Sequence, residues 1–370
     1  AKYAGLGKRV EQFSLPRAFS VFFNLAAPEQ TFQERSVRQA LALAIDRQNL
    51  VQSLAPDARA AFSPLLPEFF GFDSPALASS DKTAAKTLLR QAGFQERDGK
   101  LYKPEKTTGE FRSDLRRGSK NEEVQLLQQC LADQPGIYPD GTINGVFGPA
   151  TEQAVVRFQE KYAQEILAPS GLSKGNGQVK TGTRAKLNEI CFPQTGDNSF
   201  SITLTTVAEP TLQKVAAFIQ EEWQQLGIAV TINAVTPEEM GTNVIKPRNY
   251  EALLFGEALG IVPDPLPFWH SSQIADPGLN IAGYENKKAD VLLEKIRKET
   301  DTAKRNTLMK QLQDVLLADT AAITLYDLSY SYVVPDRLKG IEGHKIADPS
   351  QRFANVGDWY IKTGRKWKFF

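Results

Sequence analysis

The sequence holds few of the residues that build metal and redox centres. Its 370 residues include two cysteines, Cys130 and Cys191, and two histidines, His270 and His344. Neither a CxxC nor an HExxH spacing occurs, so we expect no zinc site, no other metal and no cofactor. A run of about 18 consecutive apolar residues is also missing, so no membrane-spanning helix is predicted.

An excess of either charge is missing as well. The chain has 44 basic and 43 acidic residues, which leaves a net charge of +1. Because nucleic-acid binding needs a basic surface, we expect no nucleic-acid partner. Hydrophobic residues make up 41% and charged residues 24% of the chain, which is ordinary for a globular protein. The length allows two or three domains of about 100–200 residues each.

A short repeat occupies the middle of the chain. The segment DGTINGVFGPATEQAVVRFQ (140–159) has a fainter copy in GQVKTGTRAKLNEI (177–190). Each copy has a glycine, a hydrophobic residue two places on, a threonine six on, and hydrophobic residues ten and thirteen on. These positions are Gly145, Phe147, Thr151, Val155 and Phe158 in the first copy and Gly177, Val179, Thr183, Leu187 and Ile190 in the second. The pattern predicts a small loop–helix unit that occurs twice.

Three short helices are expected around this repeat, within residues 111–193. Ser119 and Glu122 have the spacing of a capping box at the start of the first helix. Gly148 and Pro149 open the second helix, because proline is well tolerated at the first helical position. A glycine-rich loop then leads to the third helix.

The two cysteines fall at the ends of the first and third of these helices. A disulfide between Cys130 and Cys191 would close a loop of about 60 residues and add roughly 3–4 kcal/mol of stability. Small exported domains often carry such bonds, which favours the disulfide. The alternative is a pair of buried thiols.

The central region resembles the three-helix peptidoglycan-binding domain found attached to cell-wall hydrolases. The residues that carry the resemblance are Leu115–Ser119, Val124, Leu127–Gln128, Asp140–Gly141, Gly145, Phe147–Gly148, Thr151, Ala154–Val155 and Phe158–Gln159. The resemblance implies an all-α domain at 111–193 with peptidoglycan as its partner. Candidate contact residues are Tyr138, Asp140 and Asn144, although all three are also typical turn formers. The alternative is a domain kept as a spacer or contact surface.

The two flanks predict one mixed α/β structure. Before the central region, a strand is expected at 20–25 and helices at 36–54 and 81–93. After it, FSITLTTV (200–207), AVTINAV (229–235), EALLF (251–255) and AAITLY (321–326) are typical of strands, with a helix at 210–226 and two between 286 and 318. The segment from strand 200–207 to strand 229–235 forms a βαβ unit.

In order along the chain, the flanks resemble extracellular solute-binding protein family 5, the peptide- and nickel-binding receptors of ABC importers. The matching residues are Phe22–Asn24, Val37–Leu41, Ala44–Arg47, Ala84–Leu89, Ala92–Phe94, Leu226–Ile228, Pro263–Pro265, Asn280, Tyr284, Asp290, Leu292–Leu293, Arg305, Ile323 and Leu325–Tyr326. The resemblance implies the α/β second lobe of a type II periplasmic-binding-protein-like fold, interrupted by the small all-α domain. Residues 1–110 and 194–370 would form this lobe.

Only about twenty residues precede the Phe22–Asn24 strand, where the family has a complete first lobe. The chain is therefore interpreted as a fragment, and its tail at 335–370 is expected to dock on a first lobe that the chain lacks. The alternative is a genuine single-lobe protein whose function is no longer capture.

The loop FGEALGIVPDPLPFWHSSQ (255–273) is the predicted ligand surface, because α/β sheets tend to place sites past the carboxyl ends of strands. The candidate ligand-binding residues are Phe255, Glu257, Asp264, Trp269 and Tyr326. Peptide-binding members of the family use an aspartate before the Pro-Asp-Pro motif, and here Glu257 is the only acid available. Asp264 is also a candidate turn former, and Trp269 a candidate core residue.

The resemblance implies a non-catalytic extracytoplasmic receptor, in the periplasm or at the cell surface, that also carries a cell-wall-binding module. Its partners would be a peptide or other small solute, the permease of an ABC importer, peptidoglycan and the first lobe. The first alternative is a wall-associated scaffold that has lost solute capture. The second is a peptidoglycan-processing enzyme, for which the sequence offers no nucleophile–base pair and no catalytic residue.

Overall fold

The computed structural model describes residues 7–27, 30–54, 57–76, 79–103, 111–139, 141–192, 199–361 and 363. The chain forms two compact units, and each is described separately. The first consists of residues 1–102 together with 199–370, and the second is the continuous segment 103–198.

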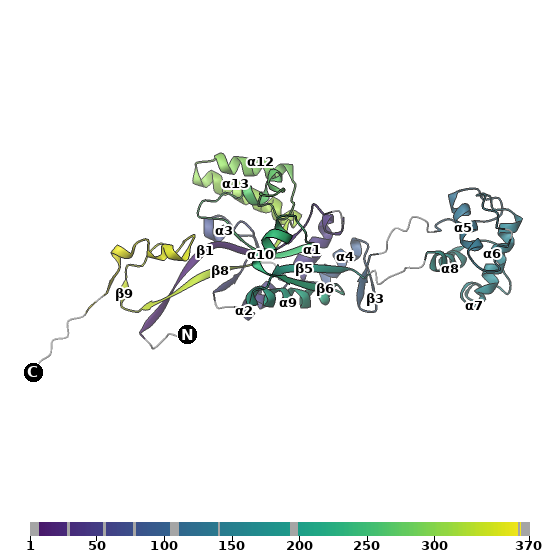
Figure 1. Ribbon diagram of the computed structural model, residues 1–370, viewed down its shortest axis with the longest axis horizontal. Helices are drawn as coiled ribbons and strands as arrows, with labels where there is room; N and C mark the ends of the chain where they lie inside the picture. Colours follow the sequence, from purple (N-terminus) through teal and green to yellow (C-terminus); the bar gives the residue numbers. More distant parts are fainter. Residues whose placement is uncertain are drawn as a thin grey trace, which may run out of the picture. The chain divides into compact units, whose positions relative to one another are not determined.

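A mixed six-stranded sheet is the centre of the first unit (Figure 1). Its order is β2-β8-β1-β7-β5-β6, where the strands are β1 (Lys8–Phe23), β2 (Ala58–Ala60), β5 (Ser201–Val207), β6 (Ala229–Val235), β7 (Ala252–Ala258) and β8 (Ala322–Pro335). Strands β5, β6 and β7 pair in parallel, whereas β1 pairs antiparallel with both β7 and β8. The helix α9 (Pro210–Gln224) links β5 to β6, which confirms the predicted βαβ unit.

Helices cover both faces of this sheet (Figure 1). The first face packs against α1 (Arg35–Ala44), α2 (Arg47–Ser53), α4 (Lys82–Gln91) and α9. The second packs against the π-helix Met240–Ile245, α11 (Leu266–Trp269), α12 (Lys287–Lys298) and α13 (Thr302–Asp319). Alternate residues of each strand point to opposite faces, so Val21 and Phe23 join the first core while Phe22 joins the second.

Short elements complete the first unit. They are η1 (Gln30–Gln33), α3 (Pro67–Phe70), β3 (Gln95–Arg97), β4 (Lys100–Tyr102), α10 (Pro237–Glu239), η4 (Ser271–Gln273), β9 (Leu338–Lys339), η5 (Pro349–Phe353), η6 (Val356–Asp358) and β10 (Tyr360–Ile361). Caps fix the predicted helices, since Asp46 accepts from Asn49 N at the start of α2 and Asp81 accepts from Ala84 N at the start of α4.

Strand β1 begins twelve residues earlier than the predicted strand, at Lys8 instead of Ser20. Its first half pairs with the distal part of β8, and the two form a ribbon that extends past the other strands (Figure 1). Ser14 at the end of this half also bridges Lys345. Polar residues and Pro16 obscure this half in the sequence, because a strand paired on one side tolerates both. In the described part of the tail, Trp359 packs against Tyr332 and Phe353, so its aromatic residues cover this ribbon.

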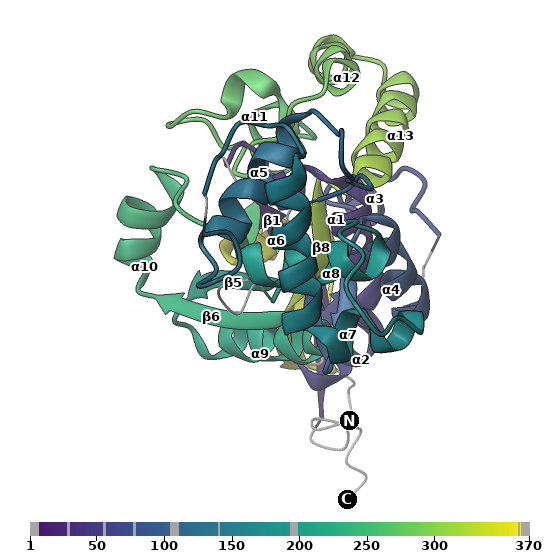
Figure 2. The same cartoon turned by 90° about the vertical axis from the view of Figure 1, so that its right-hand side faces the viewer.

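The second unit is helical (Figure 2). Its elements are α5 (Glu122–Ala132), α6 (Pro149–Lys161), α7 (Ala163–Ile166), η2 (Ala168–Ser170) and α8 (Thr181–Cys191). Pro149 opens α6 as predicted. The cap of α5 differs from the expected one, because Asn121 accepts from Val124 N while the Ser119 hydroxyl accepts from Arg116 N in the preceding turn.

Candidate functional site

The strand β7 positions the predicted ligand loop. It lies between β1 and β5, and its odd-numbered residues point to the second face of the sheet, where Leu253 is in the core and the half-buried Phe255 packs at its edge. Gly256 points to the first face, where a Cβ atom would lie 2.8 Å from the Phe19 ring. The absence of a side chain at Gly256 therefore leaves room for the Phe19 ring beneath β7.

Glu257 is the unusual residue of this strand. It lies opposite Ala18 on β1, its side chain is 7% exposed, and its Oε1 atom has no hydrogen-bond partner. Burial in this low-dielectric setting raises the pKa of the carboxyl group to about 8, because desolvation disfavours the charged form. At neutral pH the group is therefore mainly protonated.

Two further polar groups lie on the same face near Glu257. Ser20 on β1 pairs with Thr324 on β8, and on its other side with Phe255 on β7. The hydroxyl groups of Ser20 and Thr324 are buried and lack hydrogen-bond partners, as does Nε1 of Trp269. Buried polar atoms are hydrogen-bonded in most native structures. This face of the central strands is unusual because it contains buried polar atoms that make no hydrogen bond. The sequence analysis did not single out Ser20 or Thr324, because a hydroxyl in an apolar strand gives no signal by itself.

The loop after β7 combines a fixed start with exposed apolar residues. Leu259 is buried and its backbone N–H donates to Pro16 O. Ile261 and Val262 follow, with 50% and 70% of their surface exposed. Asp264 then accepts from Arg297 at 2.6 Å and from the backbone N–H of Leu266 at 3.4 Å, so it holds the turn and ties the loop to α12. Ile261 and Val262 are the side chains of this loop that are free to contact a ligand.

Two of the predicted ligand residues lie in the core. Trp269 is fully buried on α11, with its ring centroid 6.3 Å from that of Phe22 and 6.1 Å from that of Tyr284. Tyr326 is also fully buried, stacked on Phe19 at 4.7 Å between ring centroids. Neither ring has exposed surface in this structure, because helices cover both faces of the sheet. Phe255, Glu257 and Asp264 remain near the loop.

In the second unit, a buried glutamine organises each copy of the repeat. Gln128 Oε1 accepts from the backbone N–H groups of Asn144 and Gly145, while its Nε2 donates to Asn144 Oδ1, Val146 O and Thr151 Oγ1.

Gln159 makes the equivalent five bonds in the second copy. Its Oε1 accepts from Asn176 N and Gly177 N, and its Nε2 donates to Asn176 Oδ1, Gln178 O and Thr183 Oγ1. Gly145 and Gly177 have φ values of 72° and 69°, a region that favours glycine. The repeat seen in the sequence is therefore a duplicated hydrogen-bond centre.

The predicted peptidoglycan contacts have structural partners here. Tyr138 is buried, and its hydroxyl group donates to Thr142 O at 2.8 Å. The exposed Asn144 uses its Oδ1 atom to accept from Gln128 and from Val146 N. Asp140 lies outside the described residues. The exposed apolar side chains beside this loop are Ile143 and Val146.

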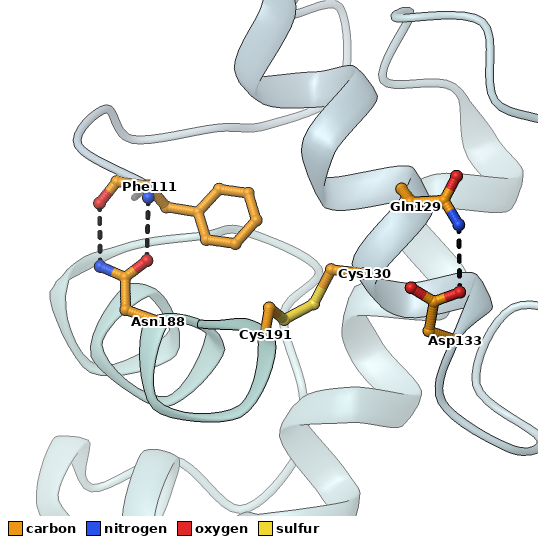
Figure 3. Close-up of a disulfide and its surroundings, with 6 residues drawn as sticks. All are labelled: Phe111, Gln129, Cys130, Asp133, Asn188 and Cys191. Atoms are coloured by element: carbon orange, nitrogen blue, oxygen red, sulfur yellow. Dashed lines mark hydrogen bonds between the residues drawn. A yellow bond between two sulfur atoms is a disulfide. The ribbon is translucent and has the colours of Figure 1, made fainter. Parts of the chain in front are cut away.

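A disulfide joins Cys130 at the end of α5 to Cys191 at the end of α8 (Figure 3). The two Cα atoms lie 5.6 Å apart, and the bond spans a sequence separation of 61 residues. Beside it, the Asn188 side chain pairs with the backbone N–H and C=O of Phe111 (Figure 3). These links tie the start and the end of the second unit together.

Within the described residues, no group of three or more His, Cys, Asp or Glu side chains is arranged to hold a metal ion. In the same part of the chain, no helix combines the length and the apolar character needed to cross a membrane.

Comparison with known proteins gives sequence similarity to solute-binding proteins. Residues 2–144 match the family described as bacterial extracellular solute-binding proteins, family 5 Middle. The oligopeptide-binding protein AppA of Bacillus subtilis is 25% identical over 206 residues, which are 55% of this chain and 35% of AppA. The dipeptide-binding protein DppE of the same organism is 28% identical over 257 residues, which cover 60% of this chain and 46% of DppE.

Solved structures share the fold. The structure of AppA from Bacillus subtilis in complex with a nonapeptide has a TM-score of 0.58 at 20% identity, and covers 98% of this chain and 54% of AppA. NikZ from Campylobacter jejuni in complex with Ni(L-His) has a TM-score of 0.56 at 17% identity, and covers 96% of this chain and 54% of NikZ. The predicted mixed α/β fold of periplasmic binding proteins is confirmed. The chain spans about half the length of these proteins.

Proposed function

We propose that this chain is part of the solute-binding component of an ABC importer, and that it acts outside the cytoplasm without catalysing a reaction. Two observations carry the proposal: the two flanks form a single α/β unit, and the chain is similar in sequence to oligopeptide- and dipeptide-binding proteins. The solute would be a peptide or another small molecule. The importer's permease and a first lobe of the same receptor would be its partners.

The loop at 259–265 is the proposed contact surface for the solute. Ile261 and Val262 offer apolar side chains to a ligand, while the ion pair of Asp264 with Arg297 holds the loop in place. Glu257 lies at the base of this loop with an unpartnered oxygen atom, and a ligand amine near it would shift the carboxyl group to its charged form.

An NMR titration of the ¹⁵N-labelled chain with a defined pool of tri- to nonapeptides tests this proposal, because it detects the weak binding expected of a single lobe. We expect shifts at residues 257–265, and loss of these shifts in the variant with Ile261→Ser and Val262→Ser. Leu279→Ser is the control, since Leu279 is about as exposed as Ile261, at 48% against 50%, but lies outside the loop. Binding that is absent, or that survives the double substitution, would contradict the proposal.

The second unit is proposed to attach the protein to the cell wall by binding peptidoglycan. The duplicated glutamine-centred loop supports this, because it builds the same rigid loop twice and leaves Ile143 and Val146 exposed on the first copy. A tether of this kind would hold a receptor near its importer and raise the effective concentration.

Co-sedimentation with purified insoluble peptidoglycan tests the attachment. We expect the protein to pellet with the wall, and the Ile143→Ser, Val146→Ser variant to remain in solution. Leu126→Ser is a matched control on the outer surface of α5. Pelleting without any peptide-induced NMR shift would instead favour a wall-associated scaffold that has lost solute capture.

A further inference from the structure

A cavity of about 350 Å³ opens at the edge of the first unit's sheet, away from the loop after β7. Strand β2 pairs with β8 only as far as Ala60 opposite Tyr326, so the edge of β8 beyond it is not covered by a strand. Apolar side chains form most of the walls, including Phe62, Leu88 and Leu317. The polar residues that line it are Gln39, Arg47, Thr320 and Thr324.

Arg47 is a cation without an acidic partner in the described part of the chain. Its Nε donates to Thr324 O at 2.7 Å, its Nη1 donates to Ala42 O at 3.3 Å, and the guanidinium lies 4.9 Å from the centroid of the Phe62 ring. No acceptor within the described residues faces its Nη2 atom. Burial lowers the pKa of Arg47 to about 10, so the group remains charged at neutral pH.

Arg38, on the neighbouring helix α1, shows how this fold neutralises a buried guanidinium. It donates to four carbonyl oxygens, those of Phe32, Gln33, Asp319 and Thr320, and the nearby Asp319 carboxylate offsets its charge. Arg47 has two carbonyl partners and no carboxylate. Arg47 is half-buried, so its charge stays open to an anion that enters the cavity.

Thr324 also lines the cavity, although its hydroxyl group is buried and has no hydrogen-bond partner. Arg47 binds the Thr324 carbonyl oxygen, which keeps the two residues together. The cavity therefore presents the cationic group of Arg47 among mainly apolar walls.

We propose that this cavity binds a small carboxylate that carries a short apolar chain. The carboxylate would accept from Arg47 Nη2, since planar guanidinium and carboxylate groups match in geometry. The apolar chain would lie against Phe62, Leu88 and Leu317. This site is separate from the loop at 259–265. The proposal can therefore be tested independently of solute binding at that loop.

A titration of the ¹⁵N-labelled protein with hexanoate, hexanamide, hexylamine and acetate tests the proposal. We expect hexanoate to shift the backbone amides of residues 39–47 and 320–324. Hexanamide should bind about tenfold more weakly because it lacks the charge, and hexylamine should not bind. Acetate should bind more than tenfold more weakly than hexanoate, because four methylene groups lose their burial.

Substitutions distinguish a loss of ligand binding from a loss of folding. Ala76→Phe places a ring on an exposed residue that lines the cavity and should abolish binding, whereas Ala303→Phe, on an exposed position of α13, should leave it unchanged. The proposal would be overturned if hexanamide and hexanoate bound with equal affinity. It would also be overturned if hexanoate affinity were unchanged in Ala76→Phe.

Discussion

The two units of this chain differ in how completely their buried polar atoms are hydrogen-bonded. In the second unit, Gln128 and Gln159 each make five hydrogen bonds that satisfy a whole loop. In the first unit, several buried side-chain atoms lack a partner. Among the described residues, each of the following has one such atom, and all lie in the first unit: Ser20, Glu257, Trp269, Arg305, Gln313, Thr324 and Arg352.

The difference fits the two roles proposed for the units, a wall-attachment domain and a solute-binding lobe. Each buried polar group without a partner costs about 1–3 kcal/mol, which a small core is poorly able to offset. The second unit has one hydrophobic cluster and satisfies its glutamines completely. The first unit has two large cores, and Ser20, Glu257 and Thr324 lie on one face of three neighbouring central strands. The larger cores of the first unit can offset the cost of these buried groups.

The largest expected effect comes from breaking one glutamine centre. Gln128→Leu leaves the Asn144 and Gly145 N–H groups and the Val146 carbonyl without their partner, so we expect a loss of roughly 4 kcal/mol in the second unit. Hydrogen exchange of peptides from residues 120–160 would measure it.

The matched control for this prediction is Gln129→Leu. Gln129 is exposed and makes a single bond to Asp133, so its loss should stay within about 0.5 kcal/mol. Gln159→Leu should resemble Gln128→Leu if the two copies are energetically equivalent. Equal effects at Gln128 and Gln129 would show that the buried network does not stabilise the unit.

Reduction of the disulfide should affect only the second unit. The Cys130–Cys191 bond closes a loop across 61 positions, and opening it should cost roughly 3–4 kcal/mol through the added entropy of the unfolded chain. Hydrogen exchange measured during denaturation, with and without reductant, should show that the reductant lowers the stability of residues 111–192 alone. An equal change in the first unit would mean that the two units unfold together.

Glu257 should make the first unit lose stability as the pH rises. The folded protein keeps this carboxyl group protonated up to about pH 8, whereas the unfolded chain ionises it above its ordinary pKa of 4.5. Unfolding therefore releases a proton in this window, and stability should fall by roughly 3 kcal/mol between pH 5 and pH 8. Urea denaturation at several pH values would measure the slope. Glu257→Gln should flatten it, and parallel curves for the two proteins would exclude a buried acid.

The sequence predicted the repeat but not the residues that organise it. Gly145, Gly177, Thr151 and Thr183 stand out because they recur at a fixed spacing within each loop and helix. Gln128 is 16 residues away from Asn144, and on its own it resembles any polar residue on a helix surface. A hydrogen bond between distant segments leaves no periodic signal, so only the folded structure reveals it.

The candidate site shows the same limit. The sequence correctly predicted β7 and the loop that follows it, because alternation and proline are local signals. The full burial of Trp269 and Tyr326 depends on which helices cover each face of the sheet, and that is decided by tertiary packing. The apolar alternation of a strand with two covered faces does not distinguish a core ring from one that lines a cleft.

Asp264 offers the smallest effect and the sharpest contrast with Glu257, seven positions earlier on the same segment. Its carboxylate is part-exposed and pairs with Arg297 at 2.6 Å, and exposed ion pairs contribute about 0–1 kcal/mol. Asp264→Asn should therefore cost about 0.5 kcal/mol, in denaturation curves compared directly with those of Glu257→Gln. A larger loss would mean that the turn, held through Leu266 N, depends on the charge of Asp264. In that case, the greater burial of the Glu257 carboxyl group would no longer be enough to explain why substituting Glu257 and substituting Asp264 have different effects.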